Sequence, residues 1–338
     1  MTFDYWVELS KSARPPDKGE LPASLEEAAW NLASGFVDRC VEWAMRGDRQ
    51  RIESRDIYVE VASKTFSLPS ALSALWSPDF DSARTGWPAS WLGIEVGFEL
   101  LTPWYSKDDR VFHVMDNPVR KDRVFGVPFM AASSWKGLLR WACRMQAGLR
   151  EHLQENDGKI GGWRDPDWIL HLFGNEKGEE EDFHRGALVF YPTWFDKIGF
   201  EVINPHSRER RAGTQPIYYE VVPGRRPRAK PRADQSGAHD GHDRNDYDPG
   251  SKGTLSLLYA PWPGMNPEAK PGEIMPKLLK AIEALLTTYG ISAKRTVGWG
   301  TAKITKWKVY RKGQVLVQEG TQEEPWKTIV NWLGEGAP

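Results

Sequence analysis

The sequence predicts an α+β fold of the ferredoxin-like (RRM-like) type, in which one antiparallel sheet carries two helices on one face. From Trp91 onward, apolar strand segments and amphipathic helix segments follow one another in the order β-α-β-β-α-β. The stretch 205–252 interrupts this order; it is polar, rich in turn residues and too long for an ordinary connection, so we interpret it as an insertion. The chain has 338 residues, enough to bury a sizeable core in one large domain or two ordinary ones.

Residues 1–90 are expected to form an N-terminal helical extension, with a helix at 25–45 after Ser24 as its cap. No role is assigned to this extension. The domain itself spans 91–312, and 313–338 holds a last helix at 323–333. Within the domain we expect, in order, a strand at 92–101, a helix after Ser133, a strand at 187–191, extended pieces near Gly199 and Pro216, a strand at 253–259, a helix at 274–289 and a strand at 301–310.

The charge balance limits how this chain could bind a polyanion. There are 45 basic and 46 acidic residues, so any nucleic-acid binding must come from local patches. Cys40 and Cys143 are far apart, and no Cys-x-x-Cys pair suggests a disulfide framework or a structural zinc site. No signal-like core or membrane-length apolar run occurs. We therefore expect a cytoplasmic protein with no membrane partner.

The run from 116 to 145 suggests a binding site for a polyanion. The helix is expected to begin after Ser133 and Ser134, both good N-caps, so that the positive end of its dipole faces a ligand. Lys136 lies in the first turn, where a cation is unfavourable unless an anion is bound. Helical spacing puts Lys136, Arg140 and Arg144 on one face; the opposite face, expected in the core, carries Leu138, Ala142, Met145 and Leu149. The alternative is an ordinary cap beside a solvated charged face.

A glycine-rich segment at 290–300 is a second candidate for phosphate binding. Glycines allow close backbone approach to a ligand, and free N–H groups beside two cations suit phosphates. Among the 17 tryptophans, the one in this segment is the best candidate for stacking on a base. By itself, such a segment is most often a turn or bulge. The candidate residues are Lys294, Arg295, Gly298, Trp299 and Gly300.

These motifs together resemble the CRISPR-associated RAMP superfamily. Gly126 and Pro128, an apolar run, then Ser133-Ser134-Trp135-Lys136-Gly137 and a Leu-Arg pair follow its pattern. The segment 116–122 resembles, more narrowly, the backbone subunits of type III interference complexes. Ala131-Ala132 stands where the family usually has Pro-Gly, and Trp135 replaces a leucine; neither change removes a charge. The resemblance covers about residues 91–310.

The resemblance implies a guide-RNA-binding subunit of a type III CRISPR effector complex, with guide RNA, target RNA and other effector subunits as partners. It implies that Asp116 cleaves target RNA with Mg²⁺ or another divalent cation bound to it, the RNA's own 2′-hydroxyl attacking the adjacent phosphate. Without that resemblance, Asp-Asn-Pro is a turn. The insertion 205–252 matches a thumb that wedges into the RNA duplex, and its expected RNA contacts are Arg208, Arg210 and Arg211.

Two other functions remain open. A non-catalytic RAMP subunit could cap or orient the same complex, and the long extension and Ala131-Ala132 favour it. An endoribonuclease that processes guide RNA would need a histidine general base, for which His113 is the candidate.

Overall fold

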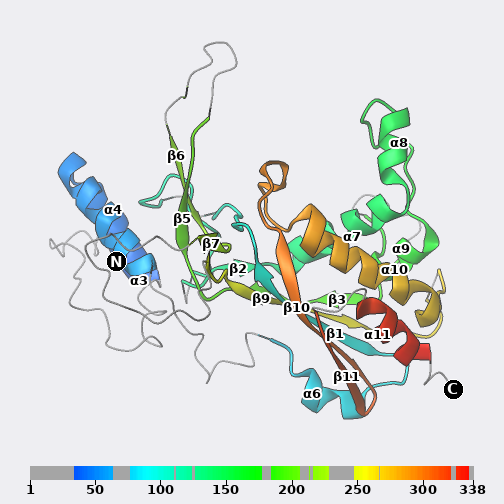
Figure 1. The fold of residues 1–338 in the computed structure, drawn as a ribbon. Helices are drawn as coiled ribbons and strands as arrows, with labels where there is room; N and C mark the ends of the chain where they lie inside the picture. Colours follow the sequence, from blue (N-terminus) through cyan, green and yellow to red (C-terminus); the bar gives the residue numbers. More distant parts are fainter. Residues whose placement is uncertain are drawn as a thin grey trace, which may run out of the picture.

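The computed structural model describes residues 34–63, 77–109, 112–123, 126–176, 184–205, 213, 216–227, 247–265, 267–320 and 325–334. Figure 1 shows a sheet with helices packed against it, a long hairpin rising beside the sheet, and a pair of helices beyond that hairpin. No helix within the described ranges is long and apolar enough to cross a membrane.

The central sheet has five strands, and each strand is antiparallel to its neighbours. The order across the sheet is β11-β10-β1-β9-β3. Strands were predicted at four of these places, and β11 was missed. The bounds are β1 (Leu92–Leu100), β3 (Leu188–Phe190), β9 (Lys252–Tyr259), β10 (Ala302–Arg311) and β11 (Gln314–Glu319).

Two long helices, α7 (Ala132–Gln146) and α10 (Pro271–Ala284), pack against each other and against one face of the sheet. A single π-helical turn continues α10 from Leu285 to Tyr289, and α11 (Pro325–Gly334) packs on α10. Two short helices, α8 (Leu149–Glu155) and α9 (Asp167–Phe173), follow α7. The helices predicted at 274–289 and 323–333 are therefore confirmed within a few residues.

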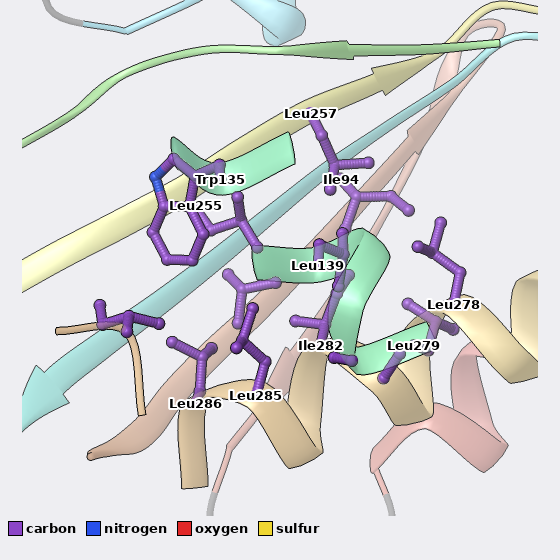
Figure 2. Close-up of a cluster of buried hydrophobic side chains, with 14 of the residues drawn as sticks. Ile94, Trp135, Leu139, Leu255, Leu257, Leu278, Leu279, Ile282, Leu285 and Leu286 are labelled. Atoms are coloured by element: carbon purple, nitrogen blue, oxygen red, sulfur yellow. The ribbon is translucent and has the colours of Figure 1, made fainter. Parts of the chain in front are cut away.

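The main core lies between this helical layer and the sheet. Even-numbered side chains of β1 point into it because side chains alternate along a strand. Figure 2 shows Ile94, Leu255 and Leu257 of the sheet facing Trp135 and Leu139 of α7. Full burial of one such leucine stabilises the fold by roughly 2 kcal/mol.

The buried face of α7 matches the predicted one in part. Ala142 and Leu149 are buried as predicted, whereas Leu138 and Met145 are only half-buried. Trp135, Leu139 and Cys143, which were not predicted to face the core, are fully buried. The Trp135 indole N–H donates to Oγ1 of Thr193 at 2.9 Å. Hydrophobicity alone could not select this face, because α7 carries apolar residues on more than one side and tertiary docking chose between them.

The other face of the sheet is partly covered by chain that precedes β1. In the turn formed by α6 (Phe80–Ala83) and a 3-10 helix (Arg84–Gly86), the Phe80 ring packs on Tyr310. Trp87 lies against Gly93, where a Cβ atom would come within 2.7 Å of the indole. This second face of the sheet is therefore closed to a ligand at the end where Phe80 and Trp87 pack.

The N-terminal extension contains α3 (Ser34–Ala44) and α4 (Asp48–Ala62), which pack on each other and on residues 114–115 to form a second, smaller core. Only the second half of the predicted helix at 25–45 lies within the described residues. Helix α4 was not predicted, because its many charged residues obscure the pattern of its buried ones, among them Ile57 and Tyr58.

A hairpin of β5 (Gly199–Ile203) and β6 (Ile217–Val221) rises between α4 and the main sheet (Figure 1). It matches the extended pieces predicted near Gly199 and Pro216, but its first strand precedes the predicted start of the insertion at 205. Arg208, Arg210 and Arg211 lie outside the described residues. Two minor pairs complete the fold: β2 (Phe129–Met130) with β4 (Thr193–Trp194), and β7 (Arg226–Pro227) with β8 (Tyr247–Asp248).

Candidate nucleic-acid interface

The start of α7 and the glycine-rich loop line the same cleft. The cleft has a volume of about 350 Å³, and both motifs contribute to it although they are far apart in the sequence. Its lining comprises Ser133, Ser134, Gly137 and Leu138 of α7, then Ile291, Ser292, Ala293 and Arg295 of the loop, with Trp104, Ser106 and Met130 between them. The fold therefore brings together the start of α7 and the segment 290–300, the two segments that were predicted to bind phosphate.

Helix α7 begins one residue before the serines, which corrects their predicted role as caps. The N-cap is Ala131, which has no side-chain hydrogen bond to the helix, and Ser133 and Ser134 lie in the first turn. An alanine cap leaves the first amide N–H groups without a side-chain acceptor. Ser133 is exposed on the cleft. This helix end is therefore suited to an external anion.

Only one of the three predicted cations of α7 is open to solvent. Lys136 is exposed, and partial burial together with the nearby Arg140 lowers its pKa. The Arg140 Nε donates to Asp165 Oδ2 at 2.8 Å, and Arg140 is only 8% exposed. Arg144 Nε donates to Asp165 Oδ1 at 2.6 Å, and its Nη2 donates to Glu176 at 2.6 Å. The predicted basic stripe is therefore not an open surface; two of its members hold the 165 loop against α7.

Arg295 places a cation in the lining of the cleft. Its guanidinium lies over the Trp141 ring at 4.5 Å, and its buried Nη1 has no hydrogen-bond partner within the described part of the chain. Burial lowers the pKa of Arg295. A partly desolvated cation with an unused donor would gain most from an anionic ligand.

The loop that carries Arg295 is held in a defined shape by its own contacts. The hydroxyl of Ser292 accepts a hydrogen bond from the Tyr105 backbone N–H at 3.0 Å and donates one to the Tyr105 carbonyl at 3.1 Å. Gly300 has φ +89°, and a Cβ atom there would lie 2.3 Å from the Ser292 nitrogen. The missing side chain of Gly300 therefore allows close approach of Ser292 of the same chain, whereas a ligand was expected there. Around Gly298 (φ +82°) there is open space.

Two other predicted residues of this loop contact the β5–β6 hairpin. The Trp299 ring meets the Tyr219 ring edge-on, with 5.8 Å between centroids, and is half-buried. The Lys294 Nζ lies 5.0 Å from the centroid of the same Tyr219 ring. Trp299 thus packs against β6, which differs from the free stacking platform that was predicted.

Asp116 lies on a loop beside the hairpin, within reach of two arginines of α4. Arg55 Nη2 is 3.1 Å from one carboxylate oxygen, and Arg51 Nη2 is 3.8 Å from the other. The Asp116 side chain is 58% exposed. The loop is fixed to the hairpin by the Asn117 side-chain amide, which donates to the Tyr218 carbonyl at 3.0 Å.

The surroundings of Asp116 do not fit a resident divalent cation. Mg²⁺ prefers several oxygen ligands, and cations beside the carboxylate oppose a further positive charge. Within the described ranges, no group of three or more His, Cys, Asp or Glu side chains could hold a metal ion. What surrounds Asp116 is instead a pair of guanidinium groups, which are typical ligands of phosphate.

A buried polar cluster joins α4, β6 and the loop that carries Asp116. Glu220 is fully buried and accepts hydrogen bonds from the Tyr58 hydroxyl, the Lys121 ammonium and the Val119 backbone N–H, the last at 2.9 Å. His113 packs edge-on against Tyr58, and its Nδ1 accepts from the Met115 N–H at 3.0 Å. This cluster gives Asp116 and the hairpin a common, rigid base.

The family model of the RAMP superfamily matches residues 97–303, which is more than half of the chain. The chain belongs to the RAMP superfamily. This confirms the family resemblance of the motifs between Gly126 and Arg140. Among solved structures, a chain of the "Cryo-EM structure of the Type III-B Cmr-beta bound to cognate target RNA" is similar at 14% identity and a TM-score of 0.48, covering 78% of this chain and 75% of that one. No curated protein matches the sequence.

Several residues at the interface of this RAMP chain were not singled out in its sequence. Arg51 and Arg55 were missed, although their i, i+4 spacing was a usable signal for one helix face. Ser292 was missed because a lone serine in a glycine-rich loop carries no pattern. The partners Asp165 and Glu176 could be found only from the folded chain, since nothing in the sequence joins them to α7.

Proposed function

We propose that this RAMP chain is an RNA-binding subunit of a type III CRISPR effector complex and holds guide RNA in the cleft between α7 and the glycine-rich loop. The observation that carries the proposal is that the start of α7, whose cap residue Ala131 makes no side-chain hydrogen bond, and Arg295 of the loop line one cleft. The exposed Lys136 lies at the same end of α7. The sheet order β10-β1-β9-β3 supports assigning the domain to the ferredoxin-like arrangement.

This cleft suits a sugar-phosphate backbone better than a base. Helix amides and cations bind phosphate oxygens without reading sequence, so the identity of the bases would be left to guide–target pairing. Affinity should therefore fall with salt and should not depend on the guide sequence.

The test is guide retention by the reconstituted complex at several salt concentrations, comparing wild type with the double variant Lys136→Glu/Arg295→Gln. The slope of log affinity against log salt should fall by about 0.7 for each phosphate contact removed. Lys312→Glu, at an exposed position in the turn between β10 and β11, is the control for a charge change elsewhere. Equal retention by the double variant and the control would refute the proposal.

Two forms of the proposal differ in the role of Asp116. Resemblance favours cleavage of target RNA through Asp116, whereas its pairing with Arg51 and Arg55 favours a subunit that caps or orients the complex without cutting. Replacing Asp116 by alanine in the complex separates them. Undiminished cleavage of target RNA at the position this subunit covers eliminates the catalytic form, and loss of that one cut eliminates the other.

A further inference from the structure

The hairpin has two functional sides because consecutive side chains of a strand point in opposite directions. Tyr219 points toward the glycine-rich loop, where its ring meets Trp299 and Lys294. Tyr218 points the other way, and the Arg55 guanidinium lies 5.7 Å from the centroid of its ring. Figure 1 shows α4 on one side of β6 and the loop before β10 on the other. Strand β6 thus separates two groups of cations and aromatic rings.

The group on the α4 side consists of Arg51, Arg55, Asp116 and Tyr218. The two arginines are four residues apart, so they share one face of α4. Both are within 3.8 Å of the same carboxylate. Two cations against one carboxylate leave a net positive charge, and Tyr218 is 46% exposed beside them.

A purely structural role explains this group poorly. Ion pairs as exposed as Arg51–Asp116, with side chains 63% and 58% exposed, contribute little to stability because water screens them. Helix α4 is already attached to the hairpin by the buried hydrogen bond of Tyr58 with Glu220. By contrast, a guanidinium pair beside an exposed tyrosine ring combines the two contacts used for single-stranded nucleic acid, phosphate binding and base stacking.

We infer that Arg51 and Arg55 bind a phosphate of the target RNA strand and that Tyr218 stacks on one of its bases. Asp116 serves as the counter-ion that the arginines exchange for this phosphate. The inference rests on the proposed function, because it takes the cleft as the place of the guide. A guide held by its phosphates in the cleft keeps its bases free for pairing. The α4 group lies on the side of β6 opposite the glycine-rich loop, and we therefore assign it to the strand that pairs with the guide.

The experiment measures target-RNA affinity and guide retention separately, in the guide-loaded complex. For Arg51→Gln/Arg55→Gln, we expect weaker target binding and a salt slope reduced by about 0.7 to 1 per phosphate contact, with guide retention unchanged. Arg49→Gln is the matched control, because Arg49 is an exposed arginine of the same helix that borders Ile52 and Glu53 instead of Asp116. Unchanged guide retention also shows that the variants fold and assemble.

Two further variants test the parts assigned to the carboxylate and the ring. Asp116→Asn frees both arginines, so target RNA should bind more tightly; weaker binding would overturn the counter-ion role. Tyr218→Phe should keep target affinity and Tyr218→Leu should lower it, since only an aromatic ring stacks on a base. Equal affinities of these two variants would overturn the stacking contact.

The outcomes distinguish this inference from the proposed function. If the arginine double variant binds target RNA like wild type, or loses guide instead of target, the α4 site is not a target contact, and the cleft is unaffected. If Lys136→Glu/Arg295→Gln retains guide like its control, the guide site itself is wrong and the inference falls with it.

Discussion

Glu220 is the residue whose replacement should damage the fold of the interface most. It is fully buried in β6, where its carboxylate bonds Lys121 and also accepts from Tyr58 and from a backbone N–H. The change Glu220→Gln keeps the size and removes the charge. The Lys121 side chain, only 2% exposed, is then a buried cation without its anion.

The expected magnitude follows from two opposing free energies. At a separation of about 3 Å and an effective dielectric constant of about 20, the attraction of the two charges is roughly 5 kcal/mol. Removing both from water costs several kcal/mol per ion, so the pair as a whole adds little to stability. If only one partner is removed, the desolvation cost of the remaining ion is no longer offset by attraction. Glu220→Gln should therefore lower the free energy of unfolding by about 3–5 kcal/mol.

Urea unfolding followed by tryptophan fluorescence measures this loss, and hydrogen exchange localises it. Exchange should speed up in the 116–122 loop and β6 and stay unchanged in β1, which lies in the other core. The double variant Glu220→Gln/Lys121→Met removes both charges, keeps an oxygen acceptor at position 220 for Tyr58 and Val119, and should recover most of the lost stability. A loss below about 1 kcal/mol in Glu220→Gln, or a double variant less stable than the single one, would refute the reasoning.

Other sites give equally direct expectations. Asp165→Asn removes the buried anion shared by the two arginines of α7 and should cost about 3–5 kcal/mol, measured by urea unfolding. Burial alone would raise the pKa of Asp165, but hydrogen bonds from these arginines and the Trp163 indole hold it below the usual 3.8. The loss of stability in Asp165→Asn should therefore be complete above about pH 4. It should shrink as the pH falls further, because the wild-type carboxylate then becomes protonated and loses the same stabilisation. Gly300→Ala meets the Ser292 nitrogen and should lower the melting temperature more than Gly298→Ala, which is strained by its positive φ but has open space around it. Equal effects of the two glycine variants would contradict this account of the loop.

Periodicity identified the elements that make up the central layers. The alternation in β1 and the apolar runs of β9 and β10 predicted their strands, because burial on one face imposes a period of two. The amphipathic pattern likewise predicted α10. It missed α4, a charged helix whose few buried residues meet only a small second core.

The sequence indicated two separate segments as candidates for phosphate binding, and the fold brings Ser133 of one and Arg295 of the other to a common cleft. Several of the expected contacts differ in the structure. Arg140 was expected to be a ligand contact, whereas Asp165 neutralises it. The spacing of residues along a helix predicts which side chains share a face. It does not predict which other part of the protein that face contacts.

The sequence by itself determined the family and four of the five central strands, and it indicated two segments whose residues suit phosphate, because these follow from local residue order. Tertiary structure alone decided which charged side chains are paired within the protein and which are open to a ligand. Asp165 pairs with Arg140 and Arg144, and α4 brings Arg51 and Arg55 to Asp116. The Nη1 of Arg295 has no hydrogen-bond partner among the residues that the structure describes. Electrostatic interactions depend on distance in space, and residues 61 positions apart, such as Arg55 and Asp116, become neighbours only when the chain folds.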